Sequence, residues 1–453
     1  MAAVFQFILV IVCVLIFVVS RRYKLSLLIL GAMCMQIFVI IPSMGITRGA
    51  MIIPLCFLMS ELFKFRLSEF GSSIVPGLIA VMVVALIIAI VSSPHATESF
   101  ASFLDVFLSG TVKGCFVLAF SYICVKSYND IKTALNATFV ALITLTIFAV
   151  LQIITGENVA VEMMQTFYTN VSERAMDINA TELESGRYAI QSLCPFPAVY
   201  GYMCVIAMLF HYYGYKKQLF GKNKMVISLF CGGLGLFLCG RRSAFLCAVV
   251  ALLTFLSIAN GFKGRVKFFV IFATLFFAVY LIFPSIQGYV DLMLNLYEET
   301  GAEGSTIEMR TLQFTSVFGY IENDWLLGRG IGFFSKDLGG NMMGRESGLK
   351  GLEGAILSIL LERGLIGVVA WIVYYLSMIV FAIKRKRNDN YTSAFVVSAI
   401  LAYVVFSNGT GDLGSSYITL LMVGMGIKLL YLAEPKFSIK TNVINKYRAW
   451  TYQ

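Results

Sequence analysis

Long apolar stretches alternate with short polar segments along nearly the whole chain. A helix needs roughly 20 apolar residues to cross the hydrocarbon core of a bilayer, and backbone polar groups in that core must be hydrogen-bonded within the protein. We therefore predict that the apolar stretches are transmembrane helices, about 12–14 in number. The predicted spans are residues 4–20, 25–42, 49–63, 74–92, 103–125, 134–154, 194–215, 225–239, 243–260, 267–284, 354–383, 392–407 and 416–432.

Basic residues gather between these stretches. When the chain is threaded through these spans, every basic cluster falls on the same side of the membrane, which the positive-inside rule assigns to the cytoplasm. This agreement supports the topology, and it places the two longest polar segments outside the cytoplasm. The clusters are Arg21–Lys24, Lys64–Arg66, Lys126–Lys132, Lys216–Lys224, Lys263–Lys267, Lys384–Arg387 and Lys436–Arg448.

The composition agrees with an all-α, polytopic membrane helical bundle. Of the 453 residues, 59% are hydrophobic and 13% are charged, which is more apolar side chain than a soluble core of this length holds. The net charge of +10 lies in the short clusters, without a basic helix or an aromatic RNA-reading motif, so we expect no nucleic-acid partner. The ten cysteines form no CxxC pair, and His95 and His211 stand far apart. We therefore expect no disulfide framework, no metal site and no cofactor.

Two polar segments, residues 155–192 and 285–352, are too long for turns, and loops of this length tend to carry function. In the second, a capping-box pattern at Ser305–Glu308 precedes apolar residues at helical spacing, which predicts a helix at the membrane surface. The stretch Gly328–Phe333 then indicates a tight backbone turn, because it lacks the features of a P-loop or a dinucleotide fingerprint. We treat residues 1–453 as a single integral membrane domain with these two long loops, 155–192 and 285–352, outside the cytoplasm; they would be periplasmic loops in a bacterial inner membrane.

The segment Gly240–Ser243 interrupts an apolar run and puts two arginines on the outer side, against the positive-inside trend. The preceding span is about 22 Å long, so Arg241 and Arg242 are expected at the interface or slightly inside it, where a charge usually has a partner. The phosphate or diphosphate headgroup of a lipid lies at this depth, and a guanidinium binds such oxygens bidentately. The alternative is a hairpin turn whose arginines snorkel or pair with an acidic loop residue.

Four further charged residues are candidates for the same outer face. Arg310 is expected off the apolar stripe of the predicted surface helix, where it either approaches the headgroup or belongs to a solvated face. Arg187 directly precedes another span and is a third arginine candidate. Glu353 and Glu362 bracket the start of the next long span. A carboxylate there either acts on a substrate hydroxyl or complements the helix dipole, and an ion pair of Glu362 with Arg363 is a further structural alternative.

Three segments of the C-terminal half resemble the O-antigen polymerase and ligase superfamily, bacterial glycosyltransferases of the GT-C kind. The N-terminal half contributes only general topology to this resemblance. Cys239–Leu246 is similar to the family's Ser-Arg-x-Ala helix start, and Glu308–Arg310 with Trp325–Phe333 is similar to its Arg followed by Gly-x-Gly-x-x-Phe. Residues 353–367 resemble its His-Asn-x-x-Leu-x-x-x-x-Glu-x-Gly-Leu-Ile-Gly segment.

The resemblance implies a GT-C-like fold and a metal-independent glycosyltransferase of the bacterial inner membrane, with its active site facing the periplasm. Donor and acceptor would be undecaprenyl-diphosphate-linked oligosaccharides, and membrane lipids and a chain-length regulator protein would be partners. By this resemblance the diphosphate would be bound by Arg241, Arg242, Arg310 and Arg187. The catalytic residues would be Glu353, Arg242 and Arg310.

One departure from the family pattern bears on the reaction. The ligases carry a functionally important histidine where this sequence has Glu353, which favours a polymerase of surface polysaccharide. An O-antigen ligase, which transfers glycan to lipid A core, is chemically close and stays open. A transporter or flippase for lipid-linked glycans would share the helix count, but such proteins typically have short external loops and charges along a pathway through the membrane.

Overall fold

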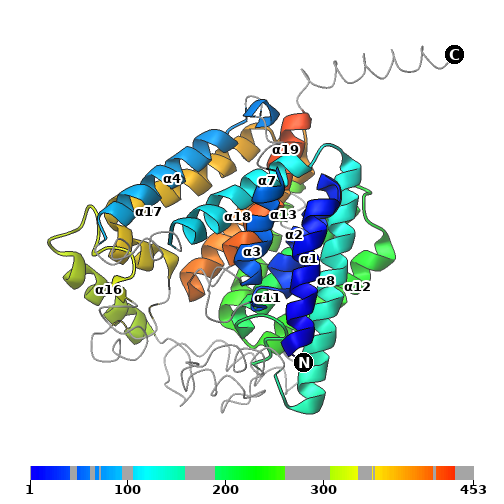
Figure 1. Ribbon diagram of the computed structural model, residues 1–453, viewed down its shortest axis with the longest axis horizontal. Helices are drawn as coiled ribbons and strands as arrows, with labels where there is room; N and C mark the ends of the chain where they lie inside the picture. Colours follow the sequence, from blue (N-terminus) through cyan, green and yellow to red (C-terminus); the bar gives the residue numbers. More distant parts are fainter. Residues whose placement is uncertain are drawn as a thin grey trace.

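Helices make up the computed structural model of the protein (Figure 1). The structure describes residues 2–40, 48–61, 67–70, 73–93, 106–158, 189–260, 307–334, 349, 352, 354–411 and 415–433. No β-strand occurs in these ranges apart from an isolated bridge between Val39 and Arg48. The helices are α1 (Ala2–Val18), α2 (Arg21–Cys34), α3 (Gly49–Glu61), η2 (Leu67–Phe70), α4 (Val75–Val91), η3 (Ser109–Phe116), α7 (Val117–Cys124), α8 (Tyr128–Thr155), α11 (Pro197–Lys216), α12 (Lys222–Cys239), α13 (Arg242–Ala259), α16 (Ile307–Ile321), α17 (Ala355–Lys384), α18 (Asn390–Thr410) and α19 (Ser415–Leu432).

The all-α fold predicted from the apolar stretches is confirmed. Seven of the described helices are long and apolar enough to cross a membrane, and shorter apolar helices accompany them. Every predicted span overlaps a helix of the structure except 267–284, which lies outside the described residues. The predicted span 25–42 is too long, because α2 ends at Cys34 and Gly49 donates a hydrogen bond back to the carbonyl of Phe38. The chain turns here instead of continuing as a helix.

Helices α13 and α18 run in opposite directions. Helix α13 lies along α18, with Ser243 against Gly409 at one end and Asn390 donating to the carbonyl of Ala259 at the other. The second of these ends carries the basic segments between helices. We call it the inner end of the bundle, and we call the opposite end the outer end.

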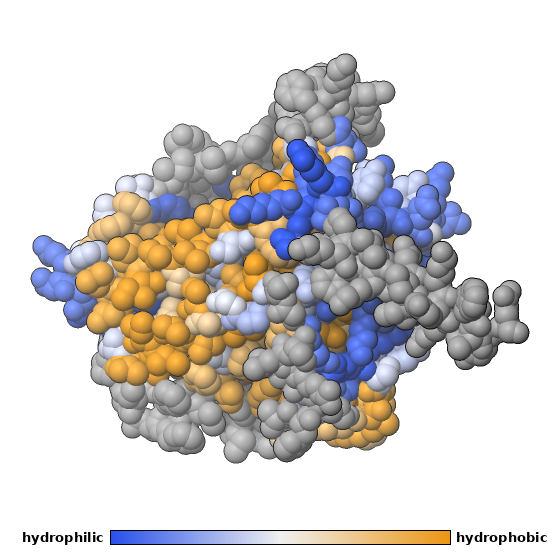
Figure 2. All heavy atoms as spheres, turned by 90° about the horizontal axis from the view of Figure 1, so that it is seen from above, coloured by the Kyte–Doolittle hydropathy of each residue, from blue (hydrophilic) through white to orange (hydrophobic). Residues whose placement is uncertain are grey.

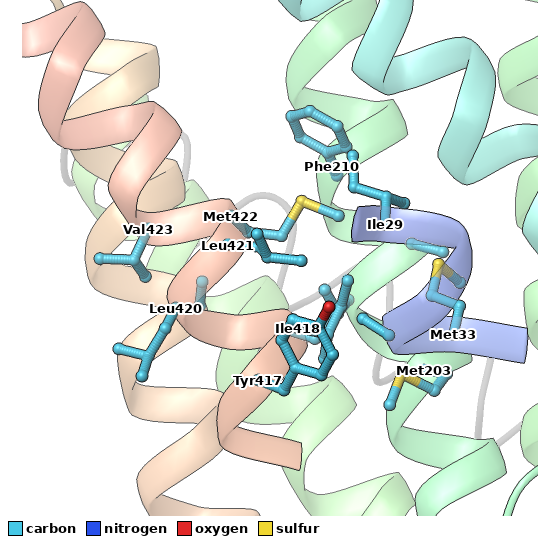
Figure 3. Close-up of a cluster of buried hydrophobic side chains, with 14 of the residues drawn as sticks. Ile29, Met33, Met203, Phe210, Tyr417, Ile418, Leu420, Leu421, Met422 and Val423 are labelled. Carbon is cyan, nitrogen blue, oxygen red and sulfur yellow. The ribbon is translucent and has the colours of Figure 1, made fainter. Parts of the chain in front are cut away.

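The core of the bundle is built from helices far apart in sequence. Side chains of α2, α11 and α19 interdigitate there, including Ile29, Met203 and Leu421 (Figure 3). Helix α19 is buried along almost its whole length, so the C-terminal helix forms the centre of the structure. Packing of this kind positions the outer ends of α11, α13 and α18 relative to one another.

The surface that faces away from this core is largely apolar. Figure 2 shows a broad hydrophobic expanse on the side of the molecule where α4 and α17 lie. Large exposed side chains along these helices include Val84, Val91, Val369 and Leu376. Contiguous exposed apolar area of this extent marks a surface covered by another apolar phase, here the lipid of a bilayer.

Buried ion pairs join the helices at the inner end. The Lys24 ammonium is 2% exposed and donates to a Glu61 carboxylate oxygen at 2.6 Å, and the Arg21 guanidinium contacts the other oxygen of that carboxylate at 2.7 Å. Arg21 also reaches Glu69, and Lys217 of α11 pairs with Asp389 before α18 at 2.9 Å. Basic residues that indicate orientation in the sequence therefore also fasten helices together.

Candidate functional site

The outer end of α18 is the meeting point of the predicted site. Its last carbonyls have no partner within the helix, as at any helix C-terminus. Arg310 of α16 supplies one: Nη2 donates to the carbonyl of Gly409 at 2.7 Å, and Nη1 lies 3.4 Å from the carbonyl of Asn408. A cation at a helix C-terminus is also favoured by the helix dipole. Arg310 therefore has a structural role at α18, beside any role toward a ligand.

The two interface arginines begin α13. Gly240 ends α12 in the left-handed conformation (φ 58°), Arg241 is the N-cap residue of α13, and Arg242 is its first helical residue. The turn is held from two sides. A Cβ on Gly201 of α11 would lie 2.5 Å from the Cys239 sulfur, and the Ser243 Cβ lies 3.1 Å from where a Cβ of Gly409 would be. Such close packing fixes the backbone from which both arginines project.

Two arginines at a helix N-terminus oppose the helix dipole, whose N-terminal end is positive. The start of α13 therefore combines two guanidinium groups with the positive end of a helix dipole, and both favour an anion. Both guanidiniums are partly exposed. An anion bound here would be favoured by the arginines and by the helix end together, which makes a phosphate or diphosphate group a good fit.

The start of α17 completes the cluster. Asn408 of α18 accepts a hydrogen bond from the backbone N–H of Ile356 at 3.2 Å, so its side chain caps the first turn of α17 from another helix. A Cβ on Gly354 would lie 3.5 Å from the carbonyl oxygen of Asn408. Arg310 approaches the same carbonyl oxygen. We call Arg241–Ser243, Arg310, Gly354 and Asn408–Gly409 the outer site.

Helix α17 is broken at Gly364, where the backbone has φ 61° and ψ −162°. The hydrogen bonds lost at this break are remade with residues 325–330. The carbonyls of residues 361 and 362 accept from the N–H groups of residues 329 and 330, at 2.8 and 3.1 Å. The N–H groups of residues 365 and 366 donate to the carbonyls of residues 325 and 326, at 2.9 and 3.3 Å. Four main-chain groups at the break are thus hydrogen-bonded within the protein, as a helix break near a membrane requires.

Glycine is required where these two segments cross. A Cβ on Gly364 would lie 2.3 Å from the Leu326 carbonyl oxygen, and one on Gly328 would lie 2.6 Å from the Gly364 nitrogen. Gly328, Gly330 and Gly332 all have positive φ, which confirms the tight turn predicted for this stretch. The Glu362 carboxylate accepts from the N–H of Gly332 at 3.1 Å, so in the described structure it holds the turn.

The break divides the predicted span 354–383, which the structure has as one apolar helix with non-helical backbone at Gly364. Residues 365–384 alone are about 30 Å long at 1.5 Å per residue, enough to cross a bilayer. The preceding piece, residues 355–363, starts at the outer end of α18 and ends beside Gly328. In the loop that contains Gly328, the Ile331 carbonyl accepts a 2.8 Å hydrogen bond from the Ser93 hydroxyl, just after α4. The piece 355–363 therefore links the outer end of α18 to the outer end of α4.

Helix α16 packs on this bridging piece, and its existence at Ile307–Ile321 confirms the helix predicted from apolar spacing. Val317 and Ile321 are buried against Leu361. The tilted rings of Phe314 and Phe318 pack against each other with centroids 4.8 Å apart, but both side chains remain about half exposed. Exposed aromatic residues suit the predicted position at a membrane surface, which stays a prediction.

The remaining predicted site residues lie elsewhere. Arg187 and Glu353 fall outside the described residues, and so does His95. The other histidine, His211, is buried in the inner half of α11, where it contacts Ser228 and the Leu135 carbonyl. In the described ranges no three His, Cys, Asp or Glu side chains lie close enough together to hold a metal ion. The sequence reasoning missed Asn408 and Gly409, although their polar, Gly-containing segment directly follows an apolar run.

Comparison with known proteins connects this region to one family. No curated protein matches the chain. Residues 227–372 match a family model described as O-antigen ligase, and this range contains the α12–α13 turn, α16, the Gly-rich turn and the break in α17. The match thus supports a glycosyl-transferring membrane enzyme without separating ligase from polymerase. It supports placing the chain in the O-antigen ligase and polymerase superfamily.

Proposed function

We propose that this protein polymerises lipid-linked oligosaccharide repeat units into O-antigen or a related surface polysaccharide. The reaction would take place at the periplasmic face of a bacterial inner membrane, with undecaprenyl-diphosphate-linked glycans as donor and acceptor. The observation that carries the proposal is the start of α13, where Arg241, Arg242 and a helix N-terminus coincide at the outer end of the bundle. This is the group of donors that a lipid diphosphate at the membrane boundary needs.

The chemistry asks mainly for positioning and charge stabilisation. An acceptor hydroxyl oxygen forms a bond to the anomeric carbon of the donor glycan, and the bond from that carbon to the diphosphate oxygen breaks. Undecaprenyl diphosphate leaves with the electron pair, so negative charge grows on the diphosphate. In our proposal Arg242 and Arg241 stabilise this charge, and Arg310 and Arg187 support them. Glu353 orients the acceptor hydroxyl or takes its proton, and no metal takes part.

The choice of polymerase over ligase rests on the position of Glu353. The resembling ligases have a functionally important histidine there. This chain has only two histidines, and His211 is buried toward the inner end. A carboxylate at this position replaces the imidazole in the proposed mechanism. A ligase, which would transfer finished glycan to lipid A core, remains the second candidate because the family match suits it equally.

The test is the surface-glycan profile of a strain that lacks the gene for this chain. A polymerase predicts that long chains disappear and a single capped repeat unit remains. Lipid-linked polymer that accumulates without transfer identifies a ligase, and an unchanged glycan profile contradicts both proposals. Complementation with the unaltered chain restores the profile in the first two cases and shows that the phenotype belongs to this protein.

A point variant ties the activity to the outer site. Arg242→Ala in the complementing gene is expected to lower polymer by more than about 100-fold, because one preorganised donor to a developing anion is typically worth that much. The matched control is Arg329→Ala, which removes an exposed guanidinium paired with Asp324 on the same side of the protein. Membrane insertion and protein level should be the same in both variants. Long chains that persist with Arg242→Ala would exclude the proposed role.

A further inference from the structure

A second basic site lies at the opposite end of the bundle. A pocket of about 420 Å³ opens between α8 and α12 at the inner end. Lys132 and Asn136 line it from α8, and residues 219–224, which form the connection into α12, line the rest. The two helices lie side by side (Figure 1), so the pocket is a notch between two membrane helices.

The charge of this pocket is of one sign. Lys132, Lys222 and Lys224 line it, and none of its lining residues is acidic. Lys224 donates to Asn136 at 3.0 Å, whereas Lys132 and Lys222 make no ion pair within the described part of the chain. Three like charges close together are unfavourable unless a counter-anion is present. This pocket therefore differs from the ion pairs nearby, where each buried lysine has its carboxylate.

The start of α12 adds to the attraction for an anion. Lys222 is the first residue of this 18-residue helix, and Gly221 before it has no side chain to cap the first backbone N–H groups. Those groups and the positive end of the helix dipole face the same notch as the three ammonium groups. A phosphate bound there would meet N–H donors and lysines together.

The rim of the pocket is rigid. The connection before α12 turns tightly, with Gln218 at φ 57° and the N–H of Leu219 bonded to the Gly214 carbonyl at 2.8 Å. Phe220, which lines the pocket, stacks on the buried His211 ring with centroids 4.6 Å apart. The pocket thus needs little reorganisation to accept a ligand, which lowers the entropic cost of binding.

From the pocket, exposed apolar side chains continue along the outer surfaces of α8 and α12. On α8, Val140 follows Asn136 by one turn and is 54% exposed. On α12, Val226 and Phe230 follow Lys222 at successive turns and are 52% and 72% exposed. A ligand with a phosphate head and hydrocarbon tails matches a cationic notch followed by exposed apolar helix surface. A soluble anion would leave the apolar part unused.

We propose that this pocket binds the headgroup of an anionic phospholipid from the inner leaflet. The phosphate is held by Lys132, Lys222, Lys224 and the start of α12, and the acyl chains lie along α8 and α12. Basic pockets between membrane helices on the cytoplasmic side are known to select such headgroups. The site is separate from the outer site, and the lipid fixes the position of α12, whose other end leads through Gly240 into Arg241 and Arg242 at the start of α13.

The test is native mass spectrometry of the purified full-length chain, titrated with dioleoyl phosphatidylglycerol or dioleoyl phosphatidylcholine. The unaltered chain is expected to bind the first lipid more tightly by tenfold or more, since each lysine near an anionic headgroup contributes on the order of fivefold. The variant Lys132→Gln, Lys222→Gln, Lys224→Gln should lose this preference. The control variant Lys384→Gln, Lys386→Gln, Arg387→Gln removes the same charge from the same end and should keep it.

Three results would overturn the proposal. It would fail if the pocket variant kept the phosphatidylglycerol preference, or if the control variant lost that preference equally. It would also fail if millimolar inorganic phosphate displaced the lipid from the unaltered chain. The last result would identify a site for a soluble phosphate compound instead. The three pocket lysines are exposed, so thermal unfolding of the pocket variant without lipid should match that of the unaltered chain and show that folding is intact.

Discussion

At the inner end of the bundle buried cations are neutralised by carboxylates, whereas at the outer end arginines are held at the ends of helices. Lys24 and Arg21 of α2 share the carboxylate of Glu61 in α3, and Arg21 also pairs with Glu69 in η2, so these charges tie three segments of the N-terminal half together. At the outer site Arg310 is bonded to main-chain carbonyls and Arg241 and Arg242 begin a helix. We therefore predict different consequences when a carboxylate-paired cation at the inner end and an arginine at a helix end of the outer site are mutated.

The difference separates charges that stabilise the fold from charges that we propose to bind an anionic substrate. A buried carboxylate partner neutralises a cation permanently, and its loss leaves an uncompensated charge. A cation at a helix N-terminus has the dipole against it and gains from an added anion. We therefore expect mutations at the inner pairs to reduce stability most, and mutations at the start of α13 to reduce activity while the fold is retained.

The largest effect on stability is expected from Glu61→Gln. This change leaves Lys24, 2% exposed, without its carboxylate, and breaking a buried pair on one side typically costs about 3–5 kcal/mol. Equilibrium unfolding in mixed micelles measures it. The control is Asp324→Asn, which removes an exposed pair with Arg329 and should cost about 0–1 kcal/mol. Equal effects from the two changes would remove the distinction between buried and exposed pairs.

The next effect is expected at the break in α17. Gly364→Ala adds a Cβ 2.3 Å from a carbonyl oxygen, in a backbone conformation whose strain alone costs roughly 1–3 kcal/mol for a non-glycine residue. The exchanged hydrogen bonds with residues 325–330 should be lost, and polymer formation should fall with them. Gly319→Ala in α16 is the matched control, because nothing lies within 4 Å of its added Cβ. A helical Gly→Ala change there should be neutral or slightly stabilising.

Arg310 tests the comparison within the outer site. Arg310→Ala removes two contacts to the end of α18, and hydrogen bonds from charged groups are worth about 1.5–3 kcal/mol each. It should therefore lower both the free energy of unfolding, by about 1–3 kcal/mol, and the yield of polymer. Arg242→Ala should lower polymer and leave the unfolding free energy within about 0.5 kcal/mol. If both variants are equally destabilised, the start of α13 is as structural as the end of α18.

Much of the helical framework follows from the sequence, because a bilayer demands apolar runs of defined length and α-helical backbone bonding. The α12–α13 turn could be placed to within a residue, since Gly240 and the arginines interrupt an otherwise apolar run. The same reasoning overextended the span 25–42 and missed the break at Gly364 inside the span 354–383. In both cases apolar residues continue past the point where the helix ends or breaks, so hydropathy along the sequence does not reveal it.

The assembly of the outer site could not be read from the chain. Arg310 and Gly409 are 99 positions apart and meet only because α16 packs on residues 355–363. Their contact depends on the four exchanged hydrogen bonds at Gly364, and nothing in the periodicity of either segment encodes a partner so distant. The glycines of the 328–332 stretch signal a turn, but what the turn fits against is set by tertiary packing.

The smallest effect is expected from Asn408, which links α18 to α17 without a charge of its own. Asn408→Ala removes the side-chain cap on Ile356, and the loss of an N-cap costs about 0.5–2 kcal/mol. Asn408→Asp keeps the acceptor and adds negative charge near the start of α17 and near Arg310, so its unfolding free energy should match or exceed that of the unaltered chain. The free energies of unfolding of the two variants, both measured by equilibrium unfolding, distinguish the contribution of the cap from that of side-chain packing. Equal destabilisation by both would mean that the amide itself, through its 2.8 Å bond to the Val404 carbonyl, is what matters at this position.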